Sequence, residues 1–169
     1  MLIDLTRVYF RKTLLAMFRF KEARRLNMVY SKILVGIDGS EMSERALNVA
    51  IELCKKIGAE LLIAHVIEKP PVLTMAKMQE ELIEKALEEY ADRLLSRALF
   101  KAEKEGVRAK PLLLRGKPGP KLCEAANKYG VDLIIVGSRG LGTISKFIVG
   151  SVSDFLVRHC TNKSILIIR

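Results

Sequence analysis

Short apolar runs alternate with longer helical patterns from Ser31 to the end of the chain. The runs are KILVGID, ELLIAHVI, AKPLLLR, DLIIVG and SILIIR, at residues 32–38, 60–67, 109–115, 132–137 and 164–169. None of them alternates cleanly between apolar and polar residues, which is typical of strands covered on both faces. Strands that alternate with helical patterns indicate parallel βαβ units. We therefore expect five parallel strands, one for each run.

The segments between these runs carry the 3.6-residue period of helices. The first predicted helix is capped by Ser40 or Ser43 and ends at Gly58, and the third begins after Pro118. The second extends from about Thr74 to Glu105, with an apolar face formed by Leu82, Ala86, Leu87, Tyr90, Leu94 and Ala98. The last begins at Ser151, where Asp154 resembles the partner in a capping box, and ends near Cys160.

Right-handed crossovers leave few topologies for five parallel strands. We prefer the strand order 3-2-1-4-5, which is an open, doubly wound, Rossmann-like α/β sheet. In that order the first and fourth strands are neighbours, and the winding changes direction between them. Ligands of such sheets bind outside the carboxyl ends of the strands at this point. The sequence therefore predicts a ligand site between residues 38–40 and residues 137–140.

The composition is that of one ordinary globular domain, with 169 residues, 50% hydrophobic and 28% charged. No apolar run approaches the roughly 18 residues of a membrane-spanning helix, and the N-terminus shows no signal-peptide cleavage site, so we expect a cytoplasmic protein. Cys54, Cys123 and Cys160 are odd in number, far apart and without a C-x-x-C pair. This spacing predicts neither a disulfide nor a zinc site, and we expect three small buried side chains.

The net charge of +10 is unevenly distributed. Residues 1–27 carry seven bases and two acids, and the other 142 residues carry 22 bases and 17 acids. No basic strand is interleaved with aromatic residues, so we expect no specific binding of nucleic acid. Residues 1–28 belong to no βαβ unit and form a basic N-terminal extension, helical or disordered, before a domain at 29–169. An arm that lies on a membrane or a partner is one interpretation of it, but we favour a tail or a true translation start at Met28.

The segment GSRGLGTISKFIVGS occupies residues 137–151. Glycines let consecutive backbone N–H groups approach an anion, and Gly150 with Ser151 opens a helix whose N-terminus favours negative charge. The hydroxyls of Ser151 and Ser153 and the guanidinium of Arg139 can add charge-assisted contacts to a polyphosphate. Neither a Walker A loop nor a dinucleotide fingerprint fits the spacing. Taken alone, the segment is equally consistent with glycines that only turn the chain.

Gly137, Gly140, Gly150 and Ser151 have the spacing G-x2-G-x9-G-[ST], which resembles the signature of the ATP-binding branch of the universal stress protein family. The resemblance extends to KILVGIDGSEMSERAL, AHVIE, GKPGPKLCEAANKYGVDLIIVGSRG and SILIIR. It implies a 3-2-1-4-5 sheet, a homodimer through the C-terminal strand and a cytoplasmic role in the stress response. Residues 1–27 have no counterpart in the family pattern.

The resemblance also implies the residues of an adenine nucleotide site. Those expected to border adenine and ribose are Ile37, Asp38, Val66, Val136 and Gly137; those expected to hold ribose and phosphates are Gly140, Gly150, Ser151, Val152 and Ser153, with Arg139 at the mouth. Asp38 has three alternative roles: it accepts a bond from a ribose hydroxyl, faces a Mg²⁺ that bridges the phosphates, or caps the following helix alongside Ser40.

Efficient hydrolysis of ATP needs a base that positions water. His65 lies inside a strand and is expected to be a satisfied core or lining residue, whereas His159 is expected to contact the carbonyl end of the last helix. We therefore favour a dimeric switch that binds ATP or AMP, with slow or no hydrolysis. A true nucleotide hydrolase, and a scaffold recruited to membrane or nucleic acid by its basic arm, are the alternatives.

Overall fold

The computed structural model describes residues 30–68, 77–138 and 150–169. Its centre is a parallel sheet of five strands in the order β3-β2-β1-β4-β5. This order confirms the predicted doubly wound, Rossmann-like α/β fold. The predicted N-terminal extension at residues 1–28 lies outside the described residues. The strands are β1 (Lys32–Gly36), β2 (Glu60–Ile67), β3 (Ala109–Arg115), β4 (Leu133–Gly137) and β5 (Ser164–Ile168).

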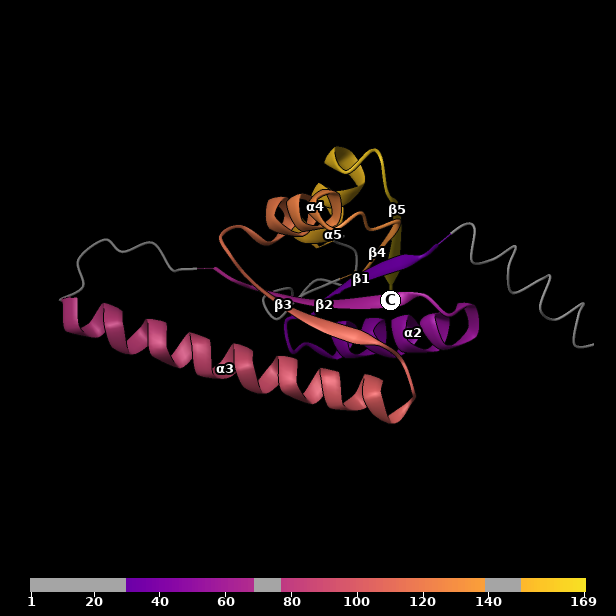
Figure 1. Ribbon diagram of the computed structural model, residues 1–169. Coiled ribbons are helices and arrows are strands. Elements are labelled where there is room, and N and C mark those ends of the chain that lie inside the picture. The colour runs from indigo at the N-terminus through magenta and orange to yellow at the C-terminus, as the bar shows by residue number, and fades with distance from the viewer. Residues whose placement is uncertain (1–29, 69–76, 139–149) are drawn as a thin grey trace, which may run out of the picture.

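Helices cover both faces of the sheet (Figure 1). In the described part of the chain, α2 (Glu41–Ile57) and α3 (Lys77–Lys104) lie on one face, and α4 (Pro118–Lys128) and α5 (Ser151–His159) lie on the other. Ile33 and Val35 of β1 pack with α2 and α3, whereas Leu34 between them packs with α4 and α5. The central strands are therefore apolar at consecutive positions because each position meets a helix layer.

The two ends of α2 are fixed by local contacts that the sequence predicts. Ser40 is the N-cap, and its Oγ accepts a hydrogen bond from the N–H of Ser43 at 3.2 Å. Gly58 is the C-cap with a φ of 74°, and its N–H donates to the carbonyl of Cys54 at 2.8 Å. Glycine adopts this left-handed conformation at little cost. The N-cap at Ser40 starts α2 shortly after the carboxyl end of β1.

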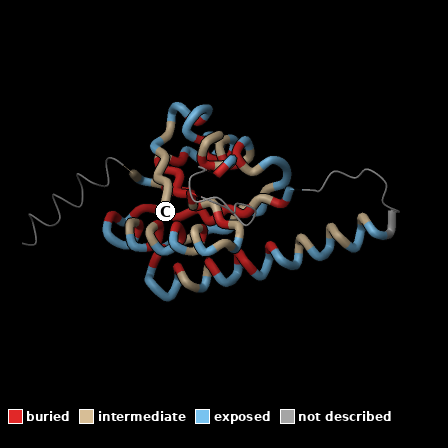
Figure 2. Tube along the Cα trace, turned by 180° about the vertical axis from the view of Figure 1, so that it is seen from behind, coloured by how far each residue is buried: buried red, intermediate tan, exposed pale blue. Residues whose placement is uncertain are grey.

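The second predicted helix is α3, and only its C-terminal half packs on the sheet. Its buried apolar residues begin at Ala91, whereas Leu82 is 63% exposed. Figures 1 and 2 show that the first turns extend past the strands. The predicted apolar face is therefore wrong at Leu82, Ala86 and Tyr90, which are exposed. The ring of Tyr90 nevertheless contacts that of His65 in β2, with the ring centroids 5.9 Å apart. Although α3 has 28 residues, no helix among the described residues is both long and apolar enough to cross a membrane.

The expectation that every strand is covered on both faces is wrong for β3. None of the residues of β3 is buried, because the strand lies at one edge of the sheet. Pro111 is compatible with this position, since an edge strand has one row of N–H groups without a partner strand.

The capping box predicted at the start of the last helix is also wrong. Gly150 is the N-cap of α5, and no side chain caps the helix. The carboxylate of Asp154 instead accepts a hydrogen bond from Nε of Arg158 at 2.9 Å. Ser151 is therefore the first residue of the helix and lies one position later than a capping box requires.

The prediction that the cysteines form no disulfide is wrong. Cys123 of α4 and Cys160, the C-cap of α5, are joined by a disulfide, with their Cα atoms 5.8 Å apart. They are 37 residues apart in the sequence, and they meet because α4 and α5 lie side by side on one face of the sheet (Figure 1). Cys54 is a free, buried thiol, as expected.

Candidate functional site

A cavity of about 340 Å³ opens at the carboxyl ends of β1, β2 and β4. All nine predicted site residues that fall among the described residues line it, whereas Arg139 and Gly140 lie outside the described residues. What these residues bind stays a prediction. The described lining residues are Gly36, Ile37, Asp38, Ser43, Ala64, Val66, Pro118, Leu122, Val136, Gly137, Gly150, Ser151, Val152 and Ser153.

The position of the cavity follows from the topology of the sheet. β1 and β4 are neighbours, with Ile33 beside Leu133. The chain leaves β1 toward β2 on one side and leaves β4 toward β5 on the other. Connections that depart in opposite directions from neighbouring strands leave a crevice between them. The cavity occupies this crevice, where the sequence predicts a ligand site.

Ile37 continues the line of β1 at the base of the cavity. Its N–H donates to the carbonyl of Ala64 at 2.8 Å, and its own carbonyl lies 2.8 Å from Nδ1 of His65. Because a carbonyl only accepts, Nδ1 of His65 carries the proton in this contact. The His65 side chain is buried and satisfied, which confirms the prediction for this residue. Nδ1 of His159 contacts the carbonyl of Phe155 at 3.0 Å, at the carbonyl end of α5 as expected.

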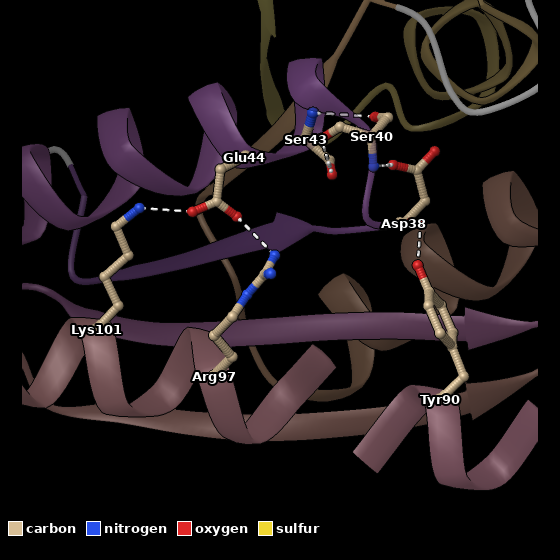
Figure 3. A network of polar contacts seen from close by, with 7 residues as sticks. All are labelled: Asp38, Ser40, Ser43, Glu44, Tyr90, Arg97 and Lys101. Carbon is tan, nitrogen blue, oxygen red and sulfur yellow. Dashed lines mark hydrogen bonds and ion pairs between the residues drawn. The ribbon is translucent and has the colours of Figure 1, made fainter. Parts of the chain in front are cut away.

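Asp38 takes part in a local turn at the mouth of the cavity (Figure 3). Its Oδ1 accepts a hydrogen bond from the N–H of Ser40 at 3.0 Å, and its backbone carbonyl accepts one from the hydroxyl of Tyr90 at 3.1 Å. Gly39 between them has a φ of 85°, and a Cβ there would lie 2.1 Å from the Tyr90 hydroxyl. Of the three roles considered for Asp38, the local one at the start of α2 is observed. The roles toward ribose and Mg²⁺ stay predictions.

The N-terminus of α5 forms another wall of the cavity. The N–H of Gly150 donates to the carbonyl of Ser138 at 2.7 Å, and the N–H of Ser138 donates to the carbonyl of Ile168 at 2.7 Å. These bonds hold the start of α5 beside the end of β4. No described residue accepts a hydrogen bond from the N–H groups of the three residues 151–153. Helix-terminal amides without an acceptor among the described residues, together with the helix dipole, make this wall attractive to an anion.

The two serines at this helix end differ in what they offer a ligand. The Ser153 side chain is fully buried, and its Oγ donates to the carbonyl of Gly150 at 2.9 Å. Its hydroxyl proton is therefore used inside the helix. Ser151 is exposed, and its hydroxyl has no partner among the described residues. Of the two hydroxyls, that of Ser151 is thus the better placed to donate to a phosphate.

Gly137 has a packing role that the sequence does not predict. A Cβ at this position would lie 2.9 Å from Cβ of Met42 and 3.0 Å from the backbone carbonyl carbon of Met42. The first turn of α2 therefore crosses directly over the end of β4. Substitution of Gly137 would displace α2 whether or not a ligand is bound, so it is a poor test of ligand binding.

Five described lining residues are absent from the predicted set: Gly36, Ser43, Ala64, Pro118 and Leu122. Pro118 and Leu122 belong to the first turns of α4, which thus borders the cavity together with α5. In the sequence Leu122 is an ordinary buried position of an amphipathic helix. Only the packing of α4 beside α5 gives it a second role.

The cavity contains one carboxylate among its described lining residues, that of Asp38. No three His, Cys, Asp or Glu side chains in the described part of the chain are grouped so that they could hold a metal ion. Mg²⁺ in nucleotide sites commonly takes one or two carboxylates together with phosphate oxygens. Asp38 therefore fits a Mg²⁺ that binds together with a nucleotide, but does not form a metal site alone.

The fold and the cavity define a Rossmann-like α/β protein with a ligand crevice at the switch point of its sheet. A model of the universal stress protein family matches residues 29–169. The chain belongs to this family, as the resemblance in its glycine-rich segment predicts.

Individual relatives agree with this assignment. Universal stress protein YxiE of Bacillus subtilis is 35% identical over 149 residues, which cover 83% of this chain and 100% of YxiE. Among solved structures, hypothetical protein MJ0577 is similar with a TM-score of 0.73 and 27% identity, over 83% of this chain and 96% of that one. A universal stress protein in complex with cAMP is similar with a TM-score of 0.65 and 26% identity, over 83% of this chain and 98% of that one.

Proposed function

We propose that this protein binds an adenine nucleotide in the cavity between β1, β4 and α5 and acts as a nucleotide-dependent switch in a stress response. The observation that carries the proposal is the N-terminus of α5 in the lining of a cavity at the switch point of the sheet. The amides of its residues 151–153 have no acceptor among the described residues. A family member of similar structure has been solved in complex with cAMP, which supports an adenine nucleotide as the ligand class. ATP or AMP is the ligand that we propose for this chain.

The polarity of the lining supports one orientation of the ligand. Ile37, Val66 and Val136 form an apolar wall, which suits the faces of an adenine ring. Asp38 and Gly137 border the ribose in this orientation. The phosphates then lie against Gly150 and the residues after it, where the free amides are, with Arg139 and Gly140 as further phosphate contacts.

We propose that turnover is slow or absent. Hydrolysis needs a group that positions or deprotonates water next to the γ-phosphate. His65 is buried with its Nδ1 proton bound to a main-chain carbonyl, so this nitrogen does not serve as a base. Asp38 would help to hold a Mg²⁺ bound with the nucleotide, and that cation would supply the positive charge that faces the phosphates. A nucleotide that persists in the cavity can shift the protein between two states to the extent that it binds them unequally.

The sharpest test uses the first residue of α5. Ser151→Glu places a carboxylate beside the proposed phosphates, while an acidic residue in the first turn favours the helix itself. Calorimetry with Mg-ATP and with AMP should show affinity lower by about tenfold or more in this variant. Ser151→Gln is the matched control, since it adds similar bulk without charge and should cost much less. Equal affinity of both variants and the wild type would refute the proposed phosphate position.

The small molecule that purifies with the protein gives an independent answer. Denaturation should release it, and its mass should be that of an adenine nucleotide. Purified protein that carries none, and that shows no heat of binding with Mg-ATP, AMP or cAMP at millimolar concentration, would contradict the proposal as a whole.

We also propose a homodimer through the outer edge of β5. The N–H of Ser164 donates to Asp132, and the carbonyl of Ile168 accepts from Ser138, so both groups point toward β4. Backbone groups alternate in direction along a strand, so the N–H groups of Ile165 and Ile167 point away from β4. No described strand pairs with them there. Ile167→Pro removes one outward N–H without removing a bond to β4, and Ile167→Ala controls for the lost side chain. The solution mass at micromolar concentration should fall to that of a monomer only for Ile167→Pro. A wild-type protein that is already monomeric would sink the idea.

A further inference from the structure

The disulfide joins the two helices that border the cavity on the same face of the sheet. Pro118 and Leu122 of α4 and the first residues of α5 line the cavity together. Cys123 directly follows Leu122, and its partner Cys160 is the C-cap of α5. The covalent bond thus fixes the end of α5 that lies away from the cavity. The other end of this nine-residue helix carries the free amides.

Between these two ends the helices are in close contact. A Cβ at Gly119 would lie 2.8 Å from the ring of Phe155, so the backbone of α4 lies directly on this side chain. The ring of Phe155 stacks on that of His159 at 4.3 Å between centroids. Leu156 of α5 is also fully buried in the cluster beneath the helix. Loss of the disulfide leaves this short helix held by side-chain packing alone, so that it can shift. A shift of α5 would move its free amides at the cavity.

The sulfur atoms differ in their access to solvent. Cys123 is half-buried on α4, whereas Cys160 is only 4% exposed. An attacking thiolate therefore reaches the sulfur of Cys123 first. Burial raises the pKa of the third cysteine, Cys54, to about 12, so this thiol stays protonated and unreactive at neutral pH. Thiol–disulfide exchange is therefore confined to Cys123 and Cys160.

We propose that Cys123 and Cys160 are a reversible redox modification site that reacts with small thiols and small disulfides, and whose state sets how firmly α5 is held at the cavity. The site lies outside the cavity lining. Its existence does not depend on the ligand, although its effect on nucleotide affinity rests on the proposed function.

The reaction balances as two thiol–disulfide exchanges. A small thiolate attacks Sγ of Cys123 and forms a mixed disulfide, while the electron pair of the protein S–S bond leaves on Sγ of Cys160, which takes up a proton from water. A second small thiolate attacks the outer sulfur of the mixed disulfide and releases Cys123 as a thiolate, which is protonated in turn. One protein disulfide and two small thiols thus give two protein thiols and one small disulfide. Oxidation is the reverse, with the small disulfide as the two-electron acceptor.

The first measurement is a redox titration of the full-length protein. The protein is equilibrated in buffers with different ratios of reduced to oxidised glutathione, quenched with acid, unfolded and alkylated. We expect one alkylated cysteine at the oxidising end and three at the reducing end, with a single transition that is the same from both directions. Three free thiols at every ratio, or one at every ratio including excess dithiothreitol, would overturn the proposal.

The second measurement is hydrogen exchange of the α5 amides in the two redox forms. Exchange at residues 151–159 should be faster in the reduced form, with exchange in α2 unchanged as the internal control. Cys123→Ser should exchange like the reduced protein at every glutathione ratio, whereas Cys54→Ala should keep the full transition. Identical exchange of α5 in the oxidised and reduced wild type would refute the coupling, even if the thiols titrate.

Measurement of nucleotide binding distinguishes failure of the redox site from failure of the proposed nucleotide-binding function. If AMP binds, its affinity should differ about fivefold between the two redox forms, and AMP should shift the glutathione midpoint by the corresponding amount. Equal affinity in both forms would refute the coupling to the cavity. If Mg-ATP, AMP and cAMP all fail to bind either form, the proposed function fails, while the thiol counts and the hydrogen exchange still decide the redox site.

Discussion

The two helix layers are attached to the same sheet by different means. Among the described residues, nineteen buried apolar residues form the cluster beneath α2 and α3, and eleven form the cluster beneath α4 and α5. Glu44 of α2 also pairs with Arg97 and Lys101 of α3 (Figure 3). The opposite layer has helices of only 11 and nine residues, joined by a disulfide.

This difference separates stability from ligand binding. The free energy of burial scales with apolar area, so the larger cluster supplies more of it. The ion pairs of Glu44 contribute little to stability because all three side chains are exposed by 39% or more. The α4–α5 layer is held to the sheet by the smaller apolar cluster. Among the described lining residues that lie outside the strands, most belong to this layer. We therefore expect substitutions in the α2–α3 layer to lower stability only. Substitutions in the α4–α5 layer should lower both stability and ligand affinity.

Paired leucine truncations test this division most strongly. Leu47→Ala in α2 removes a buried side chain from the larger cluster and should lower the free energy of unfolding by about 4 kcal/mol. Leu156→Ala in α5 should cost about 2–3 kcal/mol, because a short helix can shift to fill part of the space. Urea denaturation gives both values. AMP affinity of the folded fraction should fall only for Leu156→Ala; a fall for Leu47→Ala alone would reverse the assignment of the layers.

Removal of the disulfide tests how much the second layer depends on it. Cys123→Ser with Cys160→Ser frees a loop of 37 residues in the unfolded chain, which should lower the free energy of unfolding by about 4 kcal/mol. The wild type in excess dithiothreitol should lose a similar amount. Urea denaturation with and without reductant measures both. A double variant as stable as the oxidised wild type would show that the core alone holds α4 and α5.

The sequence predicts the sheet and the place of the cavity because both depend on short-range patterns. Apolar runs without alternation mark the buried parallel strands, and Ser40 and Gly58 mark the ends of α2 through their local caps. Once the strand order is chosen, the switch point puts Asp38 and Gly137 at one crevice. The glycine spacing then places Gly150 at the same crevice.

What the sequence does not predict depends on contacts between distant segments. The cysteine pair is joined only because α4 and α5 are adjacent, and Leu122 borders the cavity for the same reason. The exposure of Leu82 depends on how far the sheet extends beneath α3. The close approach of Gly137 and Met42 is a contact between α2 and β4 that no local pattern records.

Asp132 lies between strands and in neither helix layer, so its substitution should change stability without changing ligand affinity. Its Oδ2 accepts hydrogen bonds from the N–H and Oγ of Ser31 and from the N–H of Lys32, at 2.8–3.0 Å. These bonds tie the amino ends of β1 and β4, away from the cavity. Asp132→Asn weakens them and should cost about 1–2 kcal/mol at pH 7 without a change in AMP affinity.

The pH dependence of this cost has a defined sign. Burial raises the pKa of Asp132, but the hydrogen bonds from Lys32 and Ser31 together lower it by more, so its pKa in the folded protein lies below the ordinary 3.8. A carboxyl with a lowered pKa stabilises the fold fully above its unfolded pKa, and this contribution is lost as the pH falls through the folded pKa. Urea denaturation at pH 7 and near pH 3 should show the gap between wild type and Asp132→Asn narrowing. A gap that widens in acid would contradict the assigned bonds.

Tyr90 is the contact through which the α3 layer reaches the mouth of the cavity. Its hydroxyl donates to the carbonyl of Asp38 and lies over Gly39, but Tyr90 is 38% exposed. Tyr90→Phe should therefore cost only about 1 kcal/mol in urea denaturation, and AMP affinity measured by calorimetry should change less than about threefold. Tyr129→Phe, on an exposed tyrosine after α4 whose hydroxyl has no described partner, is the matched control and should change neither quantity. A loss of AMP affinity near tenfold in Tyr90→Phe alone would break the division between the layers, because the α3 layer would then help to hold the ligand through the turn at Asp38.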